Sequence, residues 1–135
     1  MKEKNSIVDK DLANLALKWL NETPFNIKKN CILEGKSGED YKIDFMLESK
    51  NISPTKEVTP SKLLVKVVDQ NRSLGTNVIN KMEYLSKDLN VKTLIISNKF
   101  SVQAKHLAQR TDVMIMERED LELISKANND PTKIL

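Results

Sequence analysis

The feature that most constrains the fold is the run Lys62–Gln70, which reads Lys-Leu-Leu-Val-Lys-Val-Val-Asp-Gln. A short apolar run rich in β-branched residues predicts a strand, here from Lys62 to Asp69. Both faces of this strand are apolar except at Lys66, whereas a strand that faces water on one side would alternate with polar residues. We therefore expect a central strand covered by helices on both faces.

Composition limits the class of protein. The chain has 135 residues, with 39% hydrophobic and 30% charged residues, which suits one globular domain. Lysine and arginine number 22 against 19 acidic residues, so the net charge of +3 permits nucleic-acid binding without requiring it. The only cysteine, Cys31, excludes an internal disulfide, and the only histidine, His106, excludes multi-histidine zinc chemistry. We expect a cytoplasmic protein without a membrane segment, since no apolar run approaches spanning length.

Periodicity and turn residues order the remaining elements. Helices are expected at 7–22, at 78–90, after Ser101 and at 119–126, and strands at 25–33, 41–47, 62–69, 91–97 and 113–116. Residues 48–61 and 71–77 are expected to be loops. The predicted order is α-β-β-β-α-β-α-β-α, which gives a mixed central sheet flanked by helices in one domain, 1–127. Residues 128–135 are expected to form a polar tail.

Four segments carry a resemblance to a known family: Gly38–Phe45, Lys62–Gln70, Ser73–Thr76, and Ser97–Ser101 followed by Ala104 and Ala108. In this order and spacing the chain resembles the PD-(D/E)XK nuclease superfamily. It looks most like Mrr-type restriction endonucleases and archaeal junction-resolvase-like domains, from about Leu12 to Ile124. The resemblance implies a restriction-endonuclease-like α/β fold.

The resemblance also implies a site. In this family one strand supplies an aspartate, matched here by Asp44, and the next supplies an acidic residue and a lysine two positions on. Those two positions hold Lys66 and Val68 here, and Gln70 matches a polar residue that often follows. Alternate strand residues share a face, so Asp44, Lys66 and Gln70 are expected to converge in a degenerate active site. The first helix of active relatives often adds a glutamate, for which Asp11 is a loose counterpart.

Lys66 changes the expected chemistry. Two carboxylates would hold a hard cation, whereas an ammonium beside Asp44 repels one and can neutralise the carboxylate instead. At about 4 Å such a pair interacts by roughly 4 kcal/mol at an effective dielectric of 20. We therefore expect no metal at Asp44 and a direct Asp44–Lys66 contact in its place. Asp69 lies on the opposite face of the strand by parity.

Three functions remain open from the sequence. The first is a catalytically inactive nuclease-fold protein that needs no cofactor and binds DNA weakly through basic loop residues: Lys50, Lys56, Lys62 and Arg72. The second is a diverged Mg²⁺-dependent DNA endonuclease with relocated carboxylates such as Glu39, Asp40 or Asp11. The third is a protein-interaction module or homodimer that keeps only the fold. His106 is expected to be solvated and Cys31 to be a small core residue.

Overall fold

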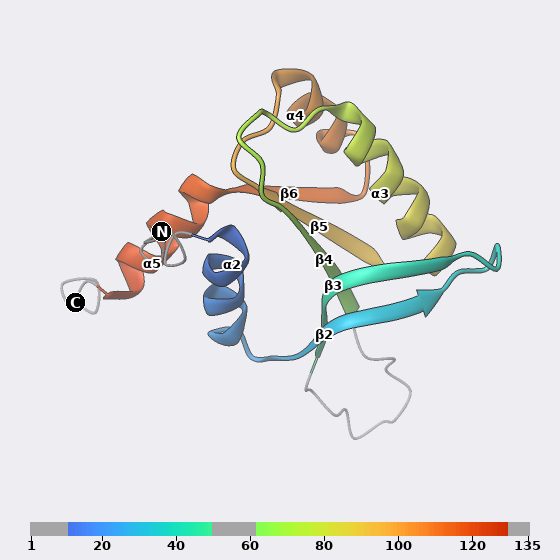
Figure 1. The fold of residues 1–135 in the computed structure, drawn as a ribbon, viewed down its shortest axis with the longest axis horizontal. Coiled ribbons are helices and arrows are strands. Elements are labelled where there is room, and N and C mark those ends of the chain that lie inside the picture. The colour runs from blue at the N-terminus through green and yellow to red at the C-terminus, as the bar shows by residue number, and fades with distance from the viewer. Residues whose placement is uncertain (1–10, 50–61, 130–135) are drawn as a thin grey trace, which may run out of the picture.

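A five-stranded mixed sheet forms the centre of the computed structural model, which describes residues 11–49 and 62–129 (Figure 1). The strands are β2 (Phe25–Glu34), β3 (Asp40–Ser49), β4 (Lys62–Val68), β5 (Lys92–Ser97) and β6 (Val113–Glu117). They lie in the order β2-β3-β4-β5-β6, with β2, β3 and β4 antiparallel and β4, β5 and β6 parallel. The predicted fold class and the central position of β4 are thus confirmed.

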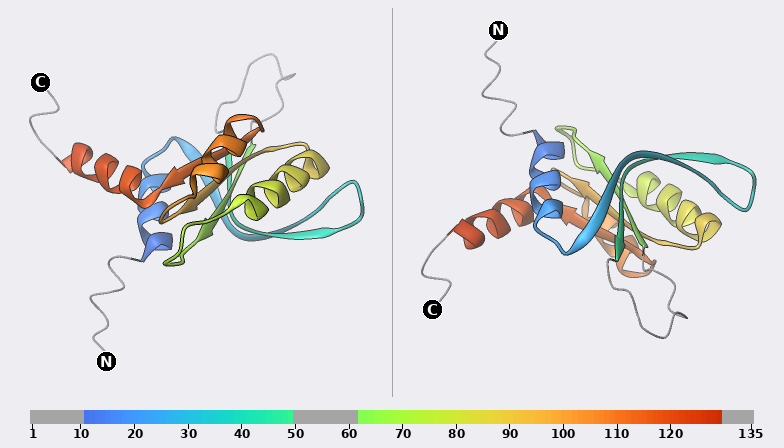
Figure 2. Two further views of the ribbon diagram at one scale, coloured as in Figure 1. Left: turned by 90° about the horizontal axis from the view of Figure 1, so that it is seen from above. Right: turned by 90° about the horizontal axis from the view of Figure 1, so that it is seen from below.

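Two helices cover each face of the sheet (Figures 1 and 2). On one face lie α3 (Thr76–Leu89) and α4 (Val102–Gln109), and on the other lie α2 (Leu12–Asn21) and α5 (Arg118–Asn129). The α3/α4 core contains Leu64 and Ile95, whereas the α2/α5 core contains Val65, Leu94 and Ile96. This alternation along β4 and β5 is that expected of strands buried on both sides.

Local signals set the helix ends. The Asp11 side chain caps α2 by accepting a hydrogen bond from the Ala13 N–H at 3.0 Å, and Ser101 caps α4 by accepting from Ala104 at 3.0 Å. The helix α3 ends at Asn90, which adopts the left-handed conformation with φ of 57°. The expected start of the first helix at residue 7 lies outside the described residues. The helix α5 reaches Asn129, so the first two residues of the expected tail are helical.

The β2–β3 hairpin is long and changes the face that it presents. In its inner half Phe45 and Leu47 pack into the α2/α5 core, but in its outer half Ile43 and Tyr41 pack against the α3/α4 core. Strict alternation would place these four odd-numbered residues on one face. The break falls at the pair Asn30–Asp44, because the regular pairing skips these two residues and Asn30 has a φ of 53°.

Asp88 at the end of α3 fixes the tip of this hairpin, as the close approach of the two elements in Figure 1 suggests. The Asp88 carboxylate accepts hydrogen bonds from the Ser37 N–H at 2.9 Å, the Ser37 hydroxyl at 2.7 Å and the Tyr41 hydroxyl at 2.8 Å. The hydrogen bonds from Ser37 lower the pKa of Asp88 below its ordinary value. The outer half of the hairpin is therefore held against α3.

Cys31 is less buried than expected. It is half-buried on the edge strand β2, where it packs against the α3/α4 core. Within residues 11–49 and 62–129, no helix combines the length and apolar character needed to cross a bilayer.

Candidate functional site

The candidate site begins where β3 and β4 separate. Their regular pairing ends at Phe45 opposite Val65, and continuing the same register would place Asp44 opposite Lys66. At this point the Asp44 Oδ2 atom accepts a hydrogen bond from the Val67 backbone N–H at 2.9 Å. A carboxylate oxygen thus supplies the acceptor that a strand carbonyl would supply in an unbroken ladder. Asp44 is therefore part of the sheet's own hydrogen bonding.

A cavity of about 600 Å³ lies between the outer half of β3, the strand β4 and the helix α3. We call it the hairpin cavity. Asp44 and Lys66 both line it, as strand parity predicts. Gln70 does not line it: this residue follows the end of β4, and its side-chain Nε2 donates a hydrogen bond to the Arg72 carbonyl at 3.0 Å. The structure thus brings together two of the three residues of the expected degenerate site.

The expected direct contact between Asp44 and Lys66 is not formed. Among the described residues no ion pair within 4.0 Å joins the two side chains. The physical reason is the Val67 N–H, which draws the Asp44 carboxylate into the gap between the strands. Lys66 is half-buried and lines the same cavity, without an ion-pair partner among the described residues.

The residues around Asp44 do not fit a divalent metal. Mg²⁺ is held by several oxygen ligands in near-octahedral geometry, and one oxygen of Asp44 already accepts the Val67 N–H. Glu39 also lines the cavity but accepts a hydrogen bond from the Tyr41 hydroxyl at 3.3 Å. Asp11 caps α2. In the part of the chain that the structure describes, no three acidic, histidine or cysteine side chains are grouped so as to bind a metal ion.

A second polar cluster lies at the carboxyl ends of β4, β5 and β6, which we call the carboxyl edge. Here the Asn98 amide donates to Asp69 at 2.8 Å, and the Arg118 Nε donates to Asn98 Oδ1 at 2.6 Å. The hydrogen bond from Asn98 lowers the pKa of Asp69, and the Leu12 N–H and the Arg118 charge lower it further against the opposing effect of burial. Asp69 thus lies outside the hairpin cavity, as strand parity predicts.

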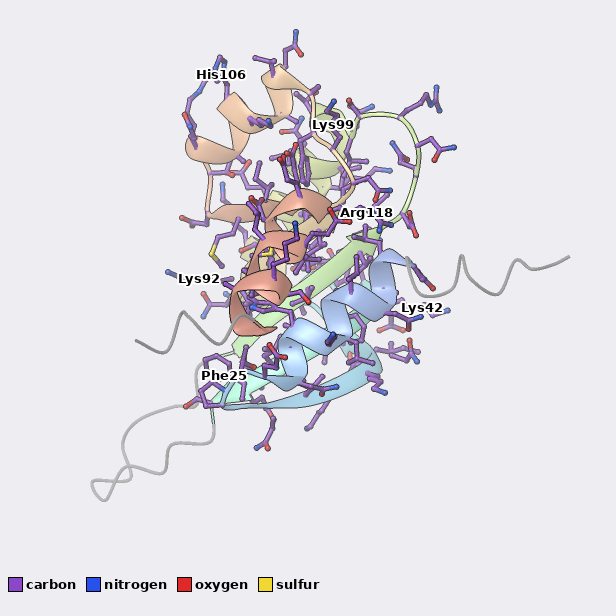
Figure 3. The ribbon with its side chains drawn as sticks, turned by 90° about the vertical axis from the view of Figure 1, so that its left-hand side faces the viewer. Phe25, Lys42, Lys92, Lys99, His106 and Arg118 are labelled. Atoms are coloured by element: carbon purple, nitrogen blue, oxygen red, sulfur yellow. The ribbon has the colours of Figure 1, made fainter. Side chains whose placement is uncertain are left out.

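Basic residues surround this carboxyl edge. Arg72 and Lys99 are exposed in the loops that follow β4 and β5, and Lys99 and Arg118 are labelled in Figure 3, which faces this end of the sheet. Neither Lys99 nor Arg118 was among the predicted DNA contacts. The available signal was position, since Arg118 directly follows the last strand, and the carboxyl ends of parallel strands meet at one edge.

The other predicted nucleic-acid contacts are distributed differently. Lys62 begins β4 and forms an ion pair with Glu48 at 3.7 Å, at the end of the strand opposite to Arg72. The strand β4 has seven residues, so its two ends lie roughly 20 Å apart. Lys50 and Lys56 lie outside the described residues. His106 is exposed on α4, as expected (Figure 3).

Comparison with known proteins supports the fold. No protein-family model matches this sequence, and no curated protein sequence matches it. Three solved structures are similar: a repair endonuclease from Pyrococcus abyssi, the MspJI restriction endonuclease in complex with a 27-mer oligonucleotide, and the DNA modification-dependent restriction endonuclease AspBHI.

The likeness is structural rather than sequential. The TM-scores are 0.53, 0.51 and 0.56, at 14%, 16% and 12% identity, over 81%, 80% and 98% of this chain. The chain spans only 46%, 24% and 34% of those three proteins. These matches confirm the predicted restriction-endonuclease-like fold.

Proposed function

We propose that this restriction-endonuclease-like domain binds DNA and does not hydrolyse it. The observation that carries the proposal is the state of Asp44. Its carboxylate accepts the Val67 N–H and shares a cavity with Lys66, where a metal-dependent nuclease needs a second carboxylate. Metal ions in nucleases stabilise the attacking and leaving oxygens. Asp44 and Lys66 together do not supply the set of ligands that would hold such an ion.

DNA binding is supported by charge at the carboxyl edge. Arg72 and Lys99 are exposed, and Arg118 is oriented by its hydrogen bond to Asn98. Arginine and lysine bind phosphates through charge-assisted hydrogen bonds. Lys62 stays in the proposal as a contact at the other end of β4, and Lys50 and Lys56 stay in it on the sequence alone. Because Lys62 already pairs with Glu48, it is expected to contribute less than Arg72.

The test is duplex DNA binding by fluorescence anisotropy over a series of salt concentrations. The slope of log K against log salt measures the phosphates contacted, at roughly 0.9 per contact. Arg72→Gln and Lys99→Gln should each weaken binding and reduce the slope by about 1. Lys92→Gln is the matched control, because Lys92 is exposed at the opposite end of β5.

Cleavage is measured on the same DNA and on single-stranded and four-way substrates with Mg²⁺ or Mn²⁺. We expect none. Cleavage that disappears in Asp44→Asn would establish the diverged endonuclease in place of the inactive protein. Absence of binding to every DNA at low salt would favour the protein-interaction or homodimer alternative.

A further inference from the structure

The hairpin cavity is lined by three lysines and by two carboxylates, those of Glu39 and Asp44, so its lining carries a net positive charge. Lys42 from β3, Lys66 from β4 and Lys81 from α3 all line it. Among the residues that the structure describes, none forms an ion pair or a hydrogen bond with these three ammonium groups. Three unpaired lysines from three different elements around one cavity are a recognition pattern for an anion.

Lys66 carries most of this argument. It is half-buried in the central strand, and the residues two positions away on its own face are the apolar Leu64 and Val68, which pack in the α3/α4 core. Burying an ammonium without a partner is unfavourable, and a bound phosphate would supply the missing charge and the hydrogen-bond acceptors. Asp44 and Glu39 also line the cavity and oppose this only partly, because Asp44 accepts the Val67 N–H and Glu39 accepts the Tyr41 hydroxyl.

The helix α3 adds an aromatic ring to the same cavity. Tyr84 is 54% exposed although it is a large aromatic residue, and it lines the cavity together with Asn80 and Lys81. Asn80 and Lys81 precede Tyr84 by four and three positions, so each lies beside Tyr84 on the helix surface. An exposed ring beside lysines is the arrangement on which proteins stack nucleobases while they bind the neighbouring phosphate.

Part of the remaining wall is apolar, which suits contact with a base. Ile43, Met82 and Leu85 line the cavity from β3 and α3, and all three belong to the α3/α4 core. Sites for small organic ligands typically measure about 300 to 1,000 Å³ and combine apolar walls with few polar groups. The cavity volume of about 600 Å³ lies within this range.

We infer that the hairpin cavity binds one nucleoside monophosphate unit, with its phosphate at Lys66 and Lys81 and its base against Tyr84. The unit has two possible sources, a free mononucleotide or one unpaired nucleotide of a DNA strand. The inference deepens the proposed DNA-binding function and rests on it, but it uses a surface separate from the carboxyl edge. In this arrangement the position that a nuclease would use for metal chemistry has become a binding pocket.

The test is isothermal titration calorimetry of the full chain with four probes: deoxyadenosine monophosphate, deoxyadenosine, inorganic phosphate and a ten-nucleotide oligo-dA. Lys66→Gln should weaken binding of the monophosphate by at least about tenfold, because it removes a charged hydrogen bond. Tyr84→Ala should weaken it by at least about fivefold. Lys92→Gln, an exposed lysine away from the cavity, should leave it unchanged.

The possible outcomes are distinct. Sensitivity to both variants with the monophosphate supports a free nucleotide, and the same sensitivity seen only with oligo-dA supports a strand nucleotide. Equal affinity for inorganic phosphate and the monophosphate, or affinity that both variants leave unchanged, would overturn the inference. Should Lys66→Gln fail to fold, Lys81→Gln on the exposed surface of α3 replaces it with the same expectation.

Duplex binding separates this inference from the proposed function. Arg72→Gln should weaken duplex binding and leave monophosphate binding intact, whereas Tyr84→Ala should do the reverse. If the protein binds duplex DNA but neither the monophosphate nor oligo-dA, only the inference about the hairpin cavity is refuted. If it binds the monophosphate but no duplex DNA, only the proposed DNA binding at the carboxyl edge is refuted.

Discussion

Asp44 is expected to stabilise the fold as a hydrogen-bond acceptor rather than as a metal ligand. Replacing it by alanine leaves the part-buried Val67 N–H without its acceptor at 2.9 Å. An unsatisfied buried donor costs about 1 to 3 kcal/mol, and partial access of water to this gap favours the lower part of that range. We expect Asp44→Ala to lower the free energy of unfolding by about 1 to 2 kcal/mol, a five- to thirty-fold change in the unfolding equilibrium.

Asparagine at the same position separates charge from geometry. Its carbonyl oxygen still accepts the Val67 N–H, but neutral hydrogen bonds are about half as strong as those to a carboxylate. Asp44→Asn should therefore retain about half of the stabilisation. The matched control is Asp40→Ala, because Asp40 is an exposed carboxylate at the start of the same strand.

The measurement is urea unfolding of all three variants and the unmodified protein, with and without Mg²⁺. An unchanged m-value makes the shift in midpoint a change in stability. The reasoning is refuted by equal stability of Asp44→Ala and Asp40→Ala. It is refuted equally by a Mg²⁺-dependent stabilisation that disappears in Asp44→Ala, since a ligand that binds only the folded state raises its stability.

Three further predictions concern stability. The folded-state pKa of Asp69 is lowered, so the stabilisation by this carboxylate is present above the unfolded pKa of about 3.9 and is lost as pH falls through the folded-state value. Thermal melts between pH 7 and pH 3 should therefore show a weaker dependence on pH for Asp69→Asn than for the unmodified protein. Parallel curves for the two proteins would contradict this. Leu64 is fully buried in the α3/α4 core, so Leu64→Ala should lower the free energy of unfolding by about 2 to 5 kcal/mol, measured by chemical denaturation. A loss below about 1 kcal/mol would mean that the core collapses around the gap. The hydroxyl of Thr93 is buried without a hydrogen-bond partner among the described residues. Thr93→Val should therefore raise the free energy of unfolding by about 1 kcal/mol in the same assay. A loss of stability would show that the hydroxyl has a hydrogen-bond partner in solution.

The order of elements could be predicted because burial leaves a strong pattern. Val65, Ile95 and Ile96 lie in strands that are apolar on both faces, which identifies the middle of a sheet. The change of face in the β2–β3 hairpin could not be predicted in this way. Alternation assumes a regular strand, and the left-handed conformation of Asn30 leaves only a weak signal, since asparagine also occurs in ordinary strands and loops.

Only one aspect of the candidate site could be predicted from the sequence, namely which side chains share a face of a strand. Parity predicts Asp44, Lys66 and Gln70 on one face and Asp69 on the other; Asp44 and Lys66 line the hairpin cavity, whereas Gln70 and Asp69 do not. It could not show that β3 and β4 separate at this point, and this separation replaces an ion pair with the Val67 N–H as the partner of Asp44. Tyr84 was not among the predicted site residues, because its place at the cavity depends on the tertiary packing of α3 against β3 and β4.

The change of face in the hairpin also bears on how the domain unfolds. The inner half of β3 contributes Phe45 to the α2/α5 core and Met46 to the α3/α4 core, and the outer half contributes Ile43 to the α3/α4 core, so both cores depend on one continuous ribbon. Detaching the outer half exposes one core and removes the anchor that limits twisting of the inner half. Opening of either helical layer is therefore coupled to the other, and amide protons behind α2 and behind α3 are expected to exchange in one cooperative event rather than in two separate units.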